Sequence, residues 1–129
     1  MSAVAAFTSP LGIRRVLWLD AISGGGSAAL SLAAPGLVSA TLGIPAGLVQ
    51  GSAWLVLAFV AFVGWLLAQP VLPLRGVRVL ALGNAAWVLA SVELVMSVPG
   101  LTALGVAYVL AQAALVAALA SLQWLASRR

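Results

Sequence analysis

Four long apolar runs, separated by a few charged residues, constrain this chain more than any other feature. Only 6% of its 129 residues are charged, whereas soluble domains have about 25%. A hydrocarbon layer about 30 Å thick is crossed by about 20 apolar residues in a helix. Runs rich in Ala and Leu without strict alternation favour helices over barrel strands. We therefore predict an all-α membrane protein, a single domain over residues 1–129 with transmembrane helices at 16–34, 46–68, 77–98 and 101–125.

Helix-breaking residues lie between the predicted spans. Pro35, Pro45, Pro70 and Pro99 are in or beside the three connections, and proline stops a helix because it lacks the backbone N–H. The first connection covers residues 35–45. Before the first span, residues 1–9 carry no charged side chain and are expected to be loose or to lie at the membrane surface, with Ser9 and Pro10 as a helix N-cap and first helical residue.

The arginines indicate the topology. All six basic residues are arginine, a composition typical of high-GC bacteria, and they precede the first span, follow the second or end the chain. Four spans place these sites on one side of the membrane, and the positive-inside rule makes that side cytoplasmic. We predict a multi-pass protein of the bacterial inner membrane with both termini in the cytoplasm. The residues that carry this prediction are Arg14, Arg15, Arg75, Arg78, Arg128 and Arg129.

The chain contains no histidine and no cysteine. This composition excludes Cys/His zinc sites, bis-histidine haem, iron–sulfur clusters, thiol nucleophiles and a Ser-His-Asp triad. We therefore expect no catalytic residue, no cofactor and no metal site, and we predict a protein that is not an enzyme. The net charge of +4 is explained by short cytoplasmic loops, so we expect the lipid bilayer and other transmembrane helices as partners, and no nucleic acid.

Small residues recur at helical spacing in every predicted span. Such stripes let helix backbones approach closely in lipid, and they predict packing seams within one bundle, between copies of the chain or with a larger membrane complex. The predicted packing residues are Ser23, Gly24, Ser27, Ser31, Gly43, Gly47, Gly51, Ala86 and Ala90.

Asp20 and Glu93 are the two acidic residues. Asp20 lies about one turn into the first predicted span, so we expect an interfacial ion pair with a nearby arginine; the alternative is a cation or proton site at the cytoplasmic mouth. Glu93 is five residues before Val98, about 7 Å inside the outer edge, where no arginine is available. A polar cluster of Glu93, Gln50 and Tyr108 at this depth would serve either packing or the uptake of protons or a cationic ligand.

Residues 12–21 can be aligned with residues 76–85, which suggests an internal repeat of two helix pairs. This alignment matches Asp20 with Asn84 and makes both candidates for the bundle interior. Asn84 and Gln112 are amides inside predicted spans, where such residues usually join helices by hydrogen bonds.

An Arg15-x-x-x-Leu19-Asp20 start and a Leu42-Gly43-Ile44-Pro45 turn resemble those of small four-helix integral membrane proteins of high-GC bacteria. The resemblance implies the fold and no activity. The function expected first is that of an accessory or structural subunit, packing against its own copies or a larger complex. The alternative is a small oligomeric transporter, channel or lipid-handling protein. Its ionisable site would be Glu93, with Asp20 as the second candidate.

Overall fold

The computed structural model describes residues 2–128, which form six helices and no strand. In chain order these are α1 (Ala3–Thr8), α2 (Pro10–Ala33), α3 (Pro35–Leu42), α4 (Ala46–Leu67), α5 (Leu74–Ser97) and α6 (Ala103–Ser127). Helices α2, α4, α5 and α6 are long and apolar enough to cross a membrane, which confirms the four long apolar helices predicted from the sequence. Arg129, one of the topology residues, lies outside the described part of the chain.

The first long helix starts earlier than its apolar run. The hydroxyl of Ser9 accepts the backbone N–H of Gly12 at 3.1 Å, and Pro10 occupies the first turn, as the sequence predicted. Helix α2 therefore begins six residues before position 16, and Arg14 and Arg15 lie inside it. Hydropathy marks where a helix becomes apolar, whereas the cap marks where it begins.

The predicted connection at residues 35–45 contains the short helix α3. Pro35 stands at its start, and Gly43 ends it with φ of 75°, a left-handed conformation that glycine adopts without steric cost. Residues 3–8, expected to be loose or interfacial, form α1. Both additions are too short to be recognised from an apolar run.

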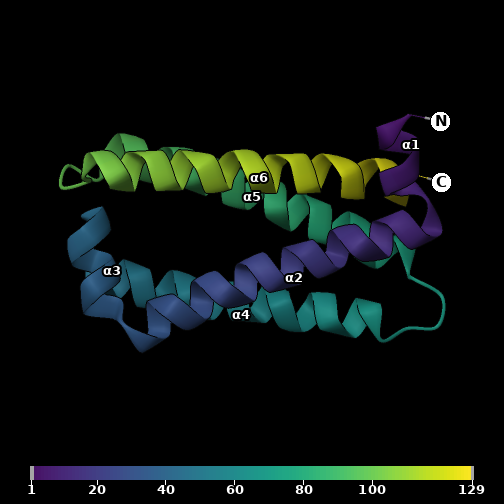
Figure 1. Cartoon of the computed structure of the whole chain (residues 1–129), viewed down its shortest axis with the longest axis horizontal. Helices are drawn as coiled ribbons and strands as arrows, with labels where there is room; N and C mark the ends of the chain where they lie inside the picture. Colours follow the sequence, from purple (N-terminus) through teal and green to yellow (C-terminus); the bar gives the residue numbers. More distant parts are fainter. Residues whose placement is uncertain (1, 129) are drawn as a thin grey trace.

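The four long helices are arranged as two pairs (Figure 1). Helix α2 packs along α4, and α5 packs along α6, whereas contacts between the two pairs are sparse. The two chain termini lie at one end of the bundle, called the terminal end here, and α3 lies at the opposite end, the α3 end. The architecture is therefore two helix hairpins that meet over part of their length.

The hydrophobic core joins the two pairs near the terminal end. One buried cluster is formed by α2, α5 and α6, and a second by α2, α4 and α5. Their members include Ile13, Leu17, Leu66, Val77 and Leu80, each at most 3% exposed. The two pairs are thus fixed to one another at this end.

At the α3 end, hydrogen bonds join the pairs. The Thr102 backbone N–H donates to the Leu42 carbonyl at 3.1 Å, and the Thr102 hydroxyl donates to the Thr41 carbonyl at 2.8 Å. Gly105 of α6 lies against the same Leu42 carbonyl, with no room for a Cβ atom. The bundle is closed at both ends, and the space between the pairs lies between these two attachments.

Two arginines occupy equivalent places in the two pairs. Arg14 of α2 donates to the carbonyls of Leu67, Gln69 and Pro70 at the end of α4, at 3.1, 2.8 and 3.2 Å. Arg78 of α5 donates to the Ser127 carbonyl at the end of α6, at 3.1 Å. Each guanidinium satisfies carbonyls that have no partner within their own helix. This correspondence is what the predicted internal repeat would produce.

Candidate functional site

Three polar side chains meet where α2, α5 and α6 cross. Asp20 Oδ2 accepts the Gln123 side-chain amide at 2.7 Å and the Asn84 amide at 3.0 Å. The Asn84 amide also donates to Gln123 Oε1 at 2.9 Å. Gln123 is 0% and Asn84 6% exposed, while Asp20 is partly buried. We call these residues the Asp20 cluster; they form a closed hydrogen-bonded triangle across the two helix pairs.

Asp20 lies further from the start of its helix than from the start of the predicted span. Because α2 begins at Pro10, Asp20 follows ten residues of helix rather than four, about 15 Å along the axis and close to its middle. Arg14 and Arg78 bind carbonyls at helix ends instead. Among the described residues no arginine forms an ion pair with Asp20, so the expected interfacial ion pair is not formed. Instead, the carboxyl group accepts hydrogen bonds from two neutral side-chain amides, those of Asn84 and Gln123.

Gln123 is the member of the cluster that sequence reasoning missed. The predicted last span ended at residue 125, which placed Gln123 at the membrane edge, where an amide needs no partner. Helix α6 continues to Ser127, and the crossing with α2 brings Gln123 to Asp20. The alignment of Asp20 with Asn84, by contrast, did point to a shared interior position, since each lies six residues after the arginine that caps its partner helix.

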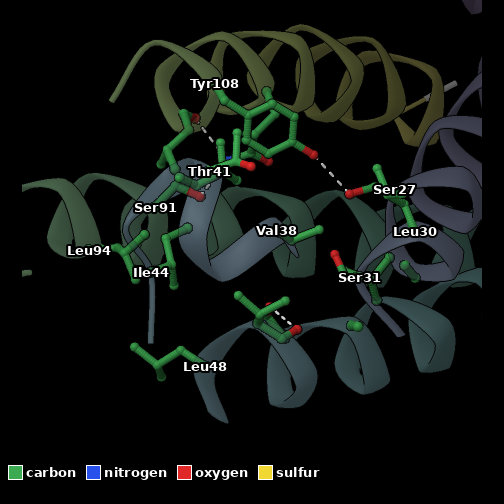
Figure 2. A pocket seen from close by; sticks show the side chains of 18 of the residues that line it. Ser27, Leu30, Ser31, Val38, Thr41, Ile44, Leu48, Ser91, Leu94 and Tyr108 are labelled. Atoms are coloured by element: carbon green, nitrogen blue, oxygen red, sulfur yellow. Dashed lines mark hydrogen bonds between the residues drawn. The ribbon is translucent and has the colours of Figure 1, made fainter. Parts of the chain in front are cut away.

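A second polar group lies nearer the α3 end. Trp87 Nε1 donates to Gln112 Oε1 at 2.9 Å, and Gln112 Nε2 donates to the Ser91 hydroxyl at 2.8 Å. Across the two pairs, the hydroxyls of Ser27 and Tyr108 are 2.9 Å apart and share a hydrogen bond. Figure 2 shows the Tyr108 ring from α6 reaching toward Ser27 on α2.

Two adjacent cavities lie between the helix pairs. The larger, of about 490 Å³, is at the α3 end; its wall is mostly aliphatic and includes residues of α3 (Figure 2). The smaller, of about 250 Å³, is lined by Asp20 and Asn84 together with Phe59 and other residues. The residues that line both cavities are Ser27, Val56, Trp87, Tyr108 and Gln112. The Ser27–Tyr108 hydrogen bond therefore lies at the boundary between the two spaces.

The predicted cluster of Glu93, Gln50 and Tyr108 is not joined by hydrogen bonds. The hydroxyl of Tyr108 pairs with Ser27. Glu93 and Gln50 are exposed, and neither side chain has a hydrogen-bond partner among the described residues. Neither lines one of the two cavities. Glu93 thus lies on the outer surface of α5, away from the space between the helix pairs.

The small-residue stripe of α2 faces the interior of the same chain. A Cβ at Gly24 would contact Val56 and Val60 of α4 at 3.3 and 3.4 Å. Ser23 donates to the Asp20 carbonyl at 3.2 Å, and Ser31 lines the larger cavity. The neighbour of Gly24 is helix α4, and the neighbour of Ser27 is Tyr108 of α6.

The other predicted packing residues divide into two groups. Gly43 is the left-handed end of α3, and the Gly100 carbonyl lies against it; Ala90 lines the larger cavity. Gly47 and Gly51 of α4 are exposed and have open space where a Cβ would lie, and Ala86 of α5 is also exposed. The predicted stripe along α4 therefore points out of the bundle.

The topology residues of the described chain gather at the terminal end. Arg14 and Arg78 contact the last carbonyls of α4 and α6 there, and Arg78 also lies over the Trp124 ring, 5.6 Å from its centroid. Arg15, Arg75 and Arg128 are exposed. The candidate site is the Asp20 cluster beside the smaller cavity, some distance from the described arginines at the terminal end. Comparison with protein-family models, with curated proteins and with solved structures finds no match for this chain.

Proposed function

We propose that this protein is a non-enzymatic, multi-pass protein of the bacterial inner membrane that binds an apolar or amphiphilic small molecule between its two helix pairs. It would act as a small transporter or a lipid-handling protein. Both termini would lie in the cytoplasm, as the arginines at the terminal end favour. The two acids do not meet in the fold, so they offer no acid–base pair for catalysis.

The larger cavity carries this proposal. Its volume of about 490 Å³ lies within the range of small-molecule sites, which are mostly apolar and have a few convergent polar groups. The cavity is open toward the outer surface of the bundle and is lined mostly by aliphatic side chains, so an apolar molecule in the surrounding hydrocarbon has a route into it. A hydrocarbon chain or a ligand of similar character matches such a wall.

A photoactivatable octanol bearing a diazirine tests the proposal in nanodiscs. We expect saturable labelling of cavity residues such as Leu48 and Val49, which unlabelled octanol suppresses. Ala90→Phe places a ring in the larger cavity and should reduce this labelling. Ala85→Phe adds the same ring at an exposed α5 position outside both cavities and should leave it unchanged. Labelling that rises linearly with probe concentration, with no difference between the two variants, would contradict the proposal.

A second candidate function rests on the outer face of α4. Gly47, Gln50 and Gly51 are exposed there, and a glycine pair at this spacing is typical of close helix contacts in lipid. This face supports the expectation of a structural subunit that packs against its own copies or a larger complex. Gly47→Leu and Gly51→Leu meet no atom of the same chain at the Cβ, so they should leave the monomer folded and reduce oligomers in native mass spectrometry. An unchanged distribution of oligomers would count against this second function.

A further inference from the structure

Two acceptor oxygens of the Asp20 cluster are left over beside the smaller cavity. Asp20 Oδ1 and Asn84 Oδ1 accept no hydrogen bond from the described residues. No buried side-chain oxygen or nitrogen in this part of the chain lacks a partner, so both oxygens are accessible rather than enclosed. Both residues line the smaller cavity. Two residues of the cavity wall thus each keep an acceptor that the fold itself does not use.

Most polar hydrogens around this cavity are, by contrast, already committed. Ser23 donates to the carbonyl of Asp20, and Trp87 donates to Gln112. Ser27 and Tyr108 share one hydrogen bond, which leaves one hydroxyl hydrogen of that pair unused. None of the residues that line the cavity is basic. A ligand that enters this space meets free acceptors and a carboxyl group, and it is therefore selected for being a donor with positive charge.

The remaining wall favours the same kind of ligand. Phe59, Trp87 and Tyr108 line the smaller cavity together with Asp20, and aromatic rings attract cations through the negative charge of their faces. A metal ion fits less well, since the described residues contain no group of three His, Cys, Asp or Glu side chains. A primary ammonium group has three N–H donors. The two unused oxygens and the aromatic faces offer it partners, and its alkyl chain tolerates apolar surroundings.

We propose that the ligand is a cationic amphiphile whose protonated amine binds Asp20 in the smaller cavity while its apolar tail occupies the larger one. The two cavities share five lining residues and therefore adjoin, and the ligand would extend from one into the other beside the Ser27–Tyr108 hydrogen bond. This inference rests on the proposed function and adds the charge and the orientation of the ligand. Asp20 is the residue that determines specificity, and Asn84 and Gln123 position it.

Radiolabelled octylamine and octanol provide a matched pair of probes, because they share an eight-carbon tail and differ in charge. An alkylamine resembles the lysine side chain, whose pKa is about 10.4, and is charged at pH 7. Both are measured by scintillation proximity with the full chain in zwitterionic nanodiscs, and empty nanodiscs correct for partitioning into lipid. Wild-type protein should bind octylamine roughly tenfold or more tighter than octanol.

Asp20→Asn removes the charge but keeps an oxygen that can accept from Asn84 and Gln123. It should weaken octylamine binding about tenfold to a hundredfold and leave octanol binding intact, which also verifies the fold. Glu93→Gln is the matched control, since it removes the other acid, which is exposed and outside both cavities. It should change neither affinity.

Equal affinity of the wild-type protein for both probes would overturn this inference and leave the proposed function standing. So would full octylamine affinity in Asp20→Asn, or its loss in Glu93→Gln. If neither probe binds saturably to the wild-type protein, the proposed function itself fails.

Discussion

Replacement of Gln123 by leucine should destabilise the protein through the Asp20 cluster alone. The substitution removes two hydrogen bonds, one to a carboxyl oxygen at 2.7 Å and one from the Asn84 amide at 2.9 Å. The site is fully buried, and leucine has a similar size, so the loss of packing is small. Hydrogen bonds between membrane helices contribute about 0.6 kcal/mol on average and about 1.7 kcal/mol at most. Two of them predict a loss of about 1–3 kcal/mol in the free energy of unfolding.

Unfolding in mixed micelles of mild detergent and SDS, followed by circular dichroism, measures this loss. Gln50→Leu is the control, because Gln50 is exposed without a side-chain partner in the described chain, and its effect should stay within about 0.5 kcal/mol. Asp20→Leu combined with Gln123→Leu should cost less than the sum of the two single changes, since both remove the same bond. Additive costs, or a Gln123→Leu protein as stable as wild type, would refute the cluster as a source of stability.

Three further predictions concern the ends of the bundle. Arg14→Ala should leave the carbonyls at the end of α4 without their donor and lower the free energy of unfolding by about 1–2 kcal/mol. Backbone amides near Leu67 should then exchange faster with solvent. Unchanged exchange would show that water replaces the guanidinium. Gly105→Ala should destabilise the α3 end, because the added methyl group meets the Leu42 carbonyl. Its control is Gly64→Ala, which has open space and should stabilise the protein by up to about 1 kcal/mol through helix propensity. Similar effects of the two changes in the same SDS titration would contradict the close contact at Gly105. Because the chain has no cysteine, single cysteines at Val71 and Gly100 report topology with an impermeant thiol reagent on intact cells, and Val71→Cys should be protected while Gly100→Cys reacts. The reverse pattern would invert the proposed orientation.

The candidate site was predictable in part. Asp20 was recognised as unusual because a charged residue inside an apolar run is costly in lipid, and its alignment with Asn84 pointed to the interior. Its place near the middle of α2 was not predicted, since hydropathy locates the apolar run and not the start of the helix at Pro10. The sequence favours Glu93 over Asp20 as the ionisable site because Glu93 has no arginine nearby, yet its side chain lies on the outer surface of α5.

The sequence by itself determined the four long helices and the collection of arginines at one end, because length, hydropathy and capping residues act locally along the chain. Only the tertiary structure decided which face of each helix is interior. In a soluble protein one apolar stripe marks the buried face, but a helix in lipid is apolar toward both its neighbours and the membrane. The pairing of α2 with α4 and of α5 with α6 therefore decided that Asp20, Asn84 and Gln123 meet beside a cavity while Glu93 does not.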